Sequence, residues 1–359
     1  MTHHRVVIVG AGFSGLGMAI TLRQEGELDF AVLERASDIG GTWRDNTYPG
    51  CRCDVPSHLY SFSFAPNPNW SSTFSPQPEI LDYLRDCAER FGVMPHIRFD
   101  CELISADWDE DAQLWRIETS QGELSADVVI AAQGPLSDPN TPELPGLERF
   151  EGTTFHSAGW NHEHELAGER VAVIGTGASA IQFVPEIQPK VEKLHVFQRT
   201  APWVMPHGGR PLSDAERRLY GRLPAAQLAM RAGIYWARES FVLQFRRPRL
   251  GQLVEKIALR HLHEQVMLSA QLVTQRGLGL QKSFRPRAIT ARARRNEPIE
   301  RRQLVARTAR EQPRSDILIA VQLRERVGRA AIGAAAMDVG AVRDEQLDHR
   351  HIPSLGRHV

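Results

Sequence analysis

The feature that most constrains this 359-residue chain is a glycine-rich motif that occurs twice, each time between a short apolar run and a helical pattern. The first copy is Gly10-Ala-Gly12-Phe-Ser-Gly15, which follows a β-branched run at residues 5–9 and precedes a helix-like segment at residues 16–25. In such a unit the first glycine allows a tight turn, the second lets the backbone approach a pyrophosphate, and the third lets helix and strand pack closely. The helix N-terminus adds N–H groups and a partial positive charge. The motif therefore predicts a dinucleotide site.

An acidic residue completes this first unit. Residues 30–33 predict a second strand, and Glu34 follows it about twenty residues beyond the loop. A carboxylate at this place can accept hydrogen bonds from the hydroxyls of an adenosine ribose. Because strand, loop, helix, strand and acid occur in order, we favour a dinucleotide site over a simple structural turn.

The second copy, Gly175-Thr-Gly177-Ala-Ser179-Ala, lies between a predicted strand at residues 170–174 and a helix that continues from Ile181. It offers the same turn, close approach and helix N-terminus as the first copy. We therefore expect Gly175, Gly177 and Ser179 to contact a second dinucleotide.

A basic residue follows the next predicted strand of the second unit. That strand covers residues 194–197 and leads to Arg199 and Thr200. An arginine can pair bidentately with a ribose 2′-phosphate, whereas a carboxylate such as Glu34 would repel one. The first site therefore suits a dinucleotide without that phosphate, and the second suits NADP. Two different dinucleotides on one chain suggest electron transfer from NADPH to a bound FAD. The alternative for Arg199 is a solvated surface charge.

The segment between the two loops has its own pattern. Alternating runs at residues 103–108, 114–119 and 124–131 predict a β-meander whose last strand returns to the parallel sheet. The proline-rich stretch at residues 138–146 is typical of a domain boundary.

Four separate motifs resemble those of one known family. Phe150-x-Gly152-x-x-x-His156-x-x-x-Trp160 resembles the fingerprint of Baeyer–Villiger monooxygenases and their relatives among class B flavin monooxygenases. The other three stand in the family's order: Gly40-Gly41-Thr42-Trp43, "YPGCRCDVPSHLY" at residues 48–60, and "QRTAPWVMP" from Gln198. The resemblance covers roughly residues 5–265, and Gln133 stands where many relatives have threonine.

The resemblance implies that the fingerprint links an FAD domain to an NADP domain. Phe150 and Trp160 would anchor the link, Gly152 would permit a turn, and His156 would supply a polar joint. Together with Asp54, His156 and Trp160 are the residues the resemblance assigns to the catalytic centre. The alternative is that His156 is a structural histidine, and we assign it no proton transfer.

The resemblance also implies contacts with the two cofactors. Asp54 would lie beside the flavin and Arg52 near the nicotinamide. Thr42, Trp43 and Tyr60 would line the FAD.

The chemistry implied by the family is oxygenation of a small molecule. NADPH reduces FAD, O₂ gives a C4a-peroxyflavin, and a ketone becomes an ester or lactone. Relatives use an arginine to stabilise the peroxide, for which Arg231 is a candidate. Oxygenation of a soft nitrogen or sulfur stays open, as does a truncated, non-catalytic nucleotide-binding remnant. A flavin disulfide reductase is disfavoured because no C-x-x-C pair occurs, and the cysteines predict no metal site.

The predicted fold is an α/β protein with two Rossmann-like dinucleotide-binding domains, for FAD and NADP, a β-meander and a helical insertion. Its predicted parts are an FAD-binding domain at 1–145, an NADP-binding domain at 146–210 with the linker 150–160, a helical insertion at 211–266, and a divergent, poorly ordered, arginine-rich tail at 267–359.

The tail is set apart by composition. Residues 269–359 contain 17 arginines and one aromatic residue, Phe284, which is too little apolar mass for a packed domain. A shifted reading frame or a shortened relative is favoured over a nucleic-acid-binding tail.

Composition also bears on partners and location. The formal net charge is zero, so no nucleic-acid or membrane-surface partner is expected. The longest apolar run, residues 330–337, is too short to span a bilayer. The first residues lead directly into a strand without a leader pattern, so the expected location is the cytoplasm. The expected partners are O₂ and a small ketone or soft nucleophile.

Overall fold

The computed structural model describes most of the chain, which forms one mixed sheet, one parallel sheet and the helices around them. The described residues are 1–199, 206–240, 242, 246–247, 251–261 and 316–320. The prediction of an α/β protein with two Rossmann-like units is confirmed by these sheets.

The first sheet has six strands in the order β3-β2-β1-β6-β5-β4. β3, β2, β1 and β6 run parallel, and β4, β5 and β6 form the predicted antiparallel meander. In register, Val7 of β1 lies opposite Ala31 of β2 and Val129 of β6. The strand bounds are β1 Thr2–Val9, β2 Phe30–Leu33, β3 Ile97–Arg98, β4 Leu103–Asp109, β5 Leu114–Thr119 and β6 Gly122–Ala131.

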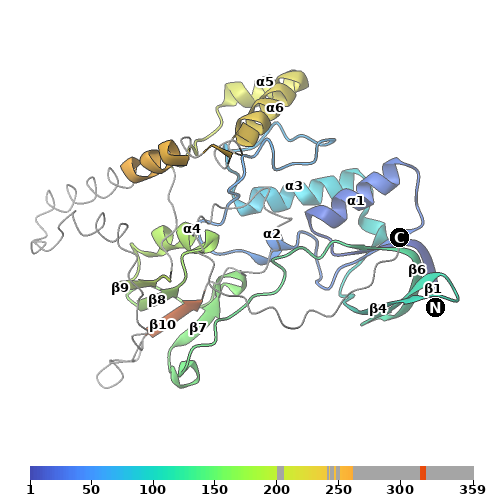
Figure 1. Ribbon diagram of the computed structural model, residues 1–359, viewed down its shortest axis with the longest axis horizontal. Helices are drawn as coiled ribbons and strands as arrows, with labels where there is room; N and C mark the ends of the chain where they lie inside the picture. Colours follow the sequence, from blue (N-terminus) through green and yellow to red (C-terminus); the bar gives the residue numbers. More distant parts are fainter. Residues whose placement is uncertain (200–205, 241, 243–245, 248–250, 262–315, 321–359) are drawn as a thin grey trace, which may run out of the picture. The chain divides into compact units, whose positions relative to one another are not determined.

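Two helices, α1 (Phe13–Gln24) and α3 (Gln77–Arg90), lie side by side in this unit (Figure 1). α3 repeats apolar residues at three- and four-residue spacings, and its inward stripe includes the fully buried Ile80 and Leu84. Leu16 is the corresponding fully buried residue of α1. The core of the first unit therefore lies between these helices and the β-branched central strands.

The second sheet has the order β7-β10-β8-β9, and all its pairs are parallel. Its strands are β7 Thr153–His156, β8 Arg170–Ile174, β9 Lys193–Phe197 and β10 Asp316–Ala320. α4 (Ala178–Ile187) lies along one face of this sheet (Figure 1). It buries Phe183 and Ile187 in one hydrophobic cluster with Val171 and Val173 of β8.

β10 was not predicted from the sequence, because it falls within the proposed tail. Its residues Asp316–Ala320 pair with β7 on one side and β8 on the other. A parallel strand flanked on both sides is a short, nearly continuous apolar run, which "DILIA" provides. The rest of the proposed tail lies outside the described residues.

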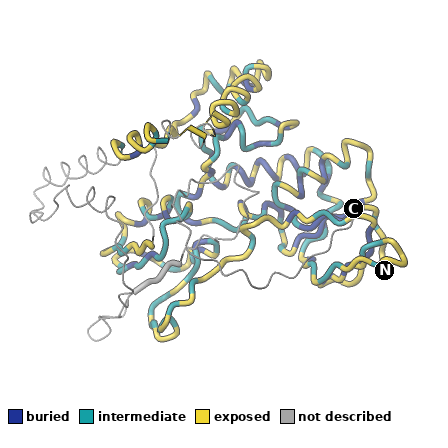
Figure 2. Tube along the Cα trace, viewed as in Figure 1, coloured by how far each residue is buried: buried dark blue, intermediate teal, exposed yellow. Residues whose placement is uncertain are grey.

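The predicted helical insertion contains α5 (Asp214–Arg222), α6 (Pro224–Ser240) and a helical stretch at residues 251–261. Figure 2 shows that much of α5 and α6 is exposed. α5 starts with a capping box in which the Ser213 hydroxyl accepts from the Glu216 N–H and the Glu216 carboxylate accepts from the Ser213 N–H.

The start of the insertion is attached to the first unit through main-chain hydrogen bonds of Leu212 and of Arg210, the residue directly before the insertion. Thr73 N–H donates to the Arg210 carbonyl at 2.9 Å, and Leu212 N–H donates to the Ser71 carbonyl at 2.9 Å. The predicted boundaries between the FAD, NADP and helical parts remain predictions.

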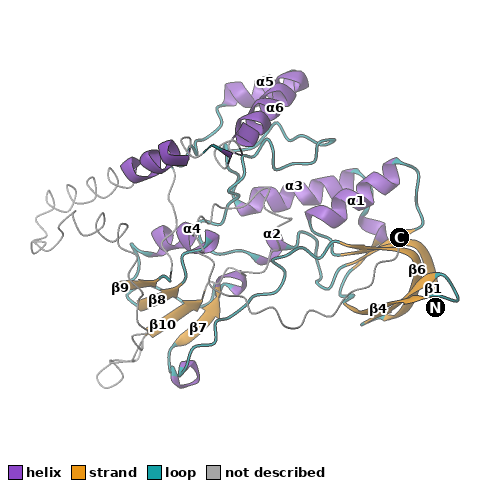
Figure 3. Cartoon of the chain, viewed as in Figure 1, coloured by secondary structure: helices purple, strands orange, loops and turns teal. Residues whose placement is uncertain are grey.

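Short helical turns complete the described structure (Figure 3). They are α2 (Thr42–Asp45) and the 3₁₀ turns Met94–His96, Leu147–Arg149 and Ser157–Gly159. In the described part of the chain, no helix combines the length and the apolar composition needed to cross a bilayer.

Candidate functional site: two dinucleotide loops

The first glycine loop has the geometry that its sequence predicts. Gly10 has φ +102°, and its N–H donates to the carbonyl of Leu33, the last residue of β2, at 2.7 Å. A Cβ on Gly15 would lie 1.8 Å from the Gly10 carbonyl oxygen, so no side chain fits there. The loop therefore depends on glycine at both positions, one for the turn and one for the close approach of helix to strand.

Gly12 differs from Gly15, because a Cβ at this position would clash with no other atom. A Cβ on Gly12 would lie 3.8 Å from the Gly41 Cα, which is ordinary contact. Gly12 is the N-cap of α1, and no side chain caps that helix. The N–H groups of the first turn are therefore left for a bound anion or water.

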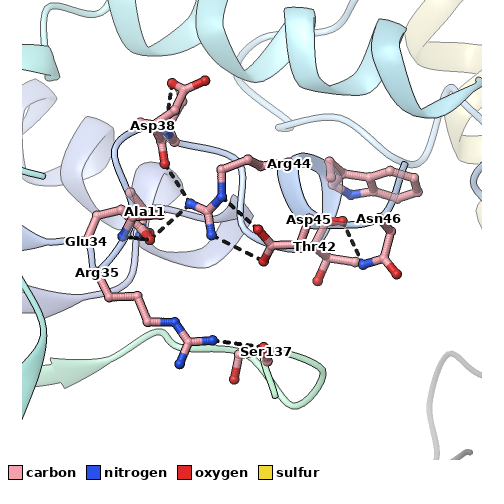
Figure 4. Close-up of polar contacts among 12 residues, drawn as sticks. Ala11, Glu34, Arg35, Asp38, Thr42, Arg44, Asp45, Asn46 and Ser137 are labelled. Atoms are coloured by element: carbon pink, nitrogen blue, oxygen red, sulfur yellow. Dashed lines mark hydrogen bonds and ion pairs between the residues drawn. The ribbon is translucent and has the colours of Figure 1, made fainter. Parts of the chain in front are cut away.

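Glu34 is buried beside this loop and is held by several donors (Figure 4). Its Oε2 accepts from the Ala11 N–H at 2.8 Å, and its Oε1 accepts from the Ala36 N–H at 3.0 Å. Arg44 donates to Oε1 at 3.0 Å. The carboxylate predicted to meet a ribose is thus fixed at the carboxyl end of β2.

Arg44 is a residue of the site that the sequence analysis did not identify (Figure 4). Besides Glu34, its guanidinium donates to the Asp38 carbonyl at 2.6 Å and to the Asp45 carboxylate at 2.8 Å. Burial lowers the pKa of Arg44, but the bonds and charges of Asp45 and Glu34 outweigh burial and leave that pKa raised. Arg44 therefore remains a cation and neutralises the buried carboxylate.

The three residues expected to line the FAD lie close in the structure. Trp43 donates its indole N–H to the Tyr60 hydroxyl at 3.0 Å, and the two rings pack edge to face. Burial raises the pKa of Tyr60 to about 12, so this phenol stays neutral. Thr42 is exposed at the start of α2, next to the buried Trp43.

The second glycine loop repeats the turn and the uncapped helix start of the first, with Ala180 in place of the third glycine. Gly175 has φ +106°, and its N–H donates at 2.8 Å to the carbonyl of Phe197, the last residue of β9. Gly177 is the N-cap of α4, again without a side-chain cap. Arg199 is exposed just beyond β9, and Thr200 lies outside the described residues.

The second unit contacts the first through the turn that contains Tyr48. The Tyr48 hydroxyl donates to the Oε1 of Gln182, a residue of α4, at 3.1 Å. The Tyr48 ring also packs edge-on against Phe183, at 6.0 Å between centroids. Nearby, the Thr47 hydroxyl and the His162 Nε2 lie 2.8 Å apart. The turn predicted to contact the flavin and nicotinamide therefore also contacts the helix of the second loop.

The fingerprint residues His156 and Trp160 lie at the end of β7 and just beyond it. Trp160 is buried against Phe155 and Phe183, with ring centroids 5.3 and 5.2 Å away. The His156 Nδ1 accepts from the Ala158 N–H at 3.1 Å, and burial lowers the pKa of this histidine. A neutral His156 therefore carries its proton on Nε2, which faces no partner among the described residues.

The arginines of α6 lie beside the segment that contains Asp54. Arg231 donates to the carbonyls of His58 at 2.7 Å and Leu59 at 3.2 Å, which ties α6 to that turn. Arg238, about two turns further along α6, donates to the Asp54 carbonyl at 3.4 Å. Arg231 thus has a structural task, and its role towards a peroxide stays a prediction.

The four cysteines are buried, and none of them forms a disulfide. Burial raises the pKa of Cys51 to about 11 and that of Cys53 to about 12. Both thiols are therefore protonated and unreactive at neutral pH.

Two glycine loops with the same turn geometry, followed by an acid in one case and an arginine in the other, are the features of a protein with two dinucleotide-binding units. The family model for flavin-binding monooxygenase-like proteins matches residues 3–211. This chain belongs to that family, and the resemblance expected from the motifs is confirmed.

Individual relatives agree. A Baeyer-Villiger monooxygenase of Streptomyces coelicolor is 57% identical over 262 residues, which are 72% of this chain and 50% of that protein. The structure of an oxidised steroid monooxygenase bound to NADP matches with TM-score 0.57 and 42% identity, over 67% of this chain and 45% of that one. OTEMO in complex with FAD and NADP matches with TM-score 0.56 and 34% identity, over 61% and 44%. The chain spans about half the length of these relatives.

Proposed function

We propose that this chain belongs to an FAD- and NADPH-dependent monooxygenase of Baeyer–Villiger type, which converts a ketone and O₂ into an ester or lactone. The observation that carries the proposal is the repeated loop geometry with opposite charge beyond it. Glu34 follows β2 of the first unit, and Arg199 lies just beyond β9 of the second. The names of the relatives support the same pair of cofactors and the same chemistry.

The first site fits the FAD that the family implies. The uncapped start of α1 at Gly12 would hold the pyrophosphate, and a Cβ on Gly12 would meet only the Gly41 Cα, at 3.8 Å. Glu34 would accept from the ribose hydroxyls with the lone pairs that its three donors leave. Trp43 and Tyr60 would line the ring system. Bound FAD supplies the redox and oxygen chemistry of the reaction.

The second site fits NADPH. The uncapped start of α4 at Gly177 would hold its pyrophosphate, and Ser179 lies on that first turn. Arg199 would pair with the 2′-phosphate. Arg52 and Asp54 are both exposed on the turn next to α4, where their side chains are available to the nicotinamide and flavin ends. The cytoplasmic location expected from the sequence stays a prediction.

The chain's own residues have two tasks in this reaction. The loops would orient the two dinucleotides from fixed helix ends, and Tyr60, Cys51 and Cys53 stay neutral because burial raises the pKa of each. Orientation of two reactants is a large share of catalysis.

Product analysis tests the proposed function. The purified protein, supplied with FAD, NADPH and air, is given a cyclic ketone in one reaction and an aryl sulfide in another. The proposal expects lactone from the ketone, in amounts that rise with NADPH consumed. Sulfoxide without any lactone would replace it with oxygenation of soft heteroatoms, and no oxygenated product from either would contradict it.

A further inference from the structure

Gln182 has an unusual set of partners for a residue on a helix surface. It lies on α4, and its side-chain amide donates at 3.0 Å to the carbonyl of Arg52. Its Oε1 accepts from the Arg52 N–H at 3.1 Å and from the Tyr48 hydroxyl at 3.1 Å. One side chain of the second unit thus holds both main-chain groups of one residue in the first.

This two-point contact mimics a neighbouring β-strand. A primary amide offers a donor and an acceptor side by side, which glutamate, lysine and leucine lack. The turn also packs tightly against the helix, since a Cβ on Gly50 would lie 2.9 Å from the Gln182 carbonyl oxygen. Backbone contact and side-chain pairing together leave residue 52 little freedom to move relative to α4.

The position of this contact matters because α4 begins in the second glycine loop. Gly177, the N-cap where the coenzyme's pyrophosphate would lie, is five residues before Gln182 on the same rigid element. Arg52 carries the exposed side chain proposed to meet the nicotinamide. Gln182 therefore sets the distance between the two ends of the coenzyme's site.

We propose that Gln182 is a positioning residue that aligns Arg52 with the second dinucleotide loop for hydride transfer. This inference rests on the proposed function, in which NADPH gives up a hydride to become NADP⁺ and FAD accepts that hydride, the hydrogen with its two electrons, to become FADH⁻. Gln182 lies outside the glycine loop that would hold the pyrophosphate, and its hydrogen bonds to the first unit go to the Tyr48 hydroxyl and the main chain of Arg52. Its loss is therefore expected to slow the transfer and to leave the binding of both cofactors nearly unchanged.

The test compares wild type, Gln182→Leu, Gln182→Glu and the control Ile181→Ala, whose side chain is 60% exposed. The first readout needs no cofactor, namely amide hydrogen exchange of the peptide that contains Tyr48 to Cys53. Gln182→Leu is expected to speed exchange at the Arg52 amide, while Ile181→Ala leaves it as in wild type. Gln182→Glu keeps the acceptor and loses the donor, so its exchange is expected between these two. If Gln182→Leu fails to fold, Gln182→Glu replaces it as the test variant.

The second readout is anaerobic flavin reduction followed by stopped flow over a range of NADPH concentrations. The limiting rate is expected to fall roughly 10- to 100-fold in Gln182→Leu, with the apparent Kd for NADPH within about twofold of wild type. An unchanged limiting rate, a loss confined to Kd, or unchanged amide exchange would overturn the inference. If wild type itself is not reduced by NADPH, the proposed function fails as well, and the wild-type arm alone reveals that.

Discussion

At the scale of single residues, the site depends on a few buried charges with defined partners. Glu34 is 4% exposed and accepts two main-chain N–H groups and the Arg44 guanidinium. Its place after the first unit was predictable from the sequence, because the spacing from the glycine loop is regular. Arg44 was not, because its role depends on three acceptors that only the fold brings together.

Replacing Glu34 with alanine is expected to destabilise the protein by about 3 kcal/mol. The change leaves a partly buried Arg44 without one carboxylate and the Ala11 N–H without its acceptor, and breaking a buried pair from one side costs this much. Urea unfolding of the cofactor-free protein measures it. Glu89→Ala, on the exposed side of α3, is the control and should stay within about 0.5 kcal/mol of wild type. A loss no larger than that of the control would show that the Arg44–Glu34 pair contributes nothing to folding.

Replacing Arg199 with alanine tests coenzyme choice. A lost charge-assisted contact to the 2′-phosphate should weaken NADPH binding by about 1–3 kcal/mol and leave NADH binding nearly unchanged. Titration calorimetry with both coenzymes measures the difference. Equal losses for NADPH and NADH would mean that Arg199 only supports the fold.

At the scale of elements, much of the fold could be predicted. The runs at residues 30–33, 114–119 and 170–174 coincide with β2, β5 and β8. α1 begins at Phe13, three residues before the expected start, because Gly15 packs inside its first turn. β10 could not be predicted, since a five-residue apolar run has no period to detect and its place is set by the gap between β7 and β8.

Replacing the second and the third glycine of the first loop with alanine should change the stability of the protein by different amounts. Gly15→Ala forces a methyl group against the Gly10 carbonyl, 1.8 Å away, and should cost about 3 kcal/mol or more of stability. Gly12→Ala meets only the Gly41 Cα at 3.8 Å, so it should change stability by no more than about 1 kcal/mol.

Gly12→Ala should nevertheless weaken FAD binding about tenfold or more, which is about 1.4 kcal/mol. Its methyl group would occupy the space through which the backbone approaches the pyrophosphate. FAD titration and thermal unfolding of both variants separate the two effects. If a folded Gly12→Ala variant binds FAD as tightly as wild type, the first loop does not form part of the flavin site.

The attachment of α5 and α6 to the first unit should depend on pH through His58, whose ring packs edge to face on Tyr220 of α5 and whose Nδ1 lies 3.4 Å from the Gln227 Nε2 of α6. Burial, and secondarily the charge of Arg231, lower the pKa of this histidine against an opposing effect of Glu216. The unfolded state therefore binds a proton, below about pH 6.5, that the folded state does not. The stability contributed by a neutral His58 is present above that pH and is lost as the pH falls towards the folded pKa.

Urea unfolding at pH values on either side of this window measures the effect. The unfolding free energy of wild type should fall on acidification, and it should fall less in His58→Asn. Equal slopes for the two proteins would show that His58 takes up its proton without strain on the fold.

At the scale of the whole molecule, the chain combines two units that each contain a parallel strand, a glycine loop and a helix. The sequence predicted both glycine loops and the opposite charges beyond them. It did not predict how the units meet, because Gln182 and Arg52 are 130 residues apart and no local pattern marks the contact. The linker residue Trp160 joins the same region by packing on Phe183 of α4. In the proposed function, electrons pass from the second site to the first.

Anaerobic addition of NADPH to the FAD-loaded protein tests this claim most directly. The flavin absorption band should bleach with NADPH at a much higher rate than with NADH at equal concentration, and one NADPH should be consumed per FAD reduced. A band that persists with NADPH and bleaches only with dithionite would contradict the proposed function. It would show that the flavin is bound but receives no electrons from NADPH at the second loop.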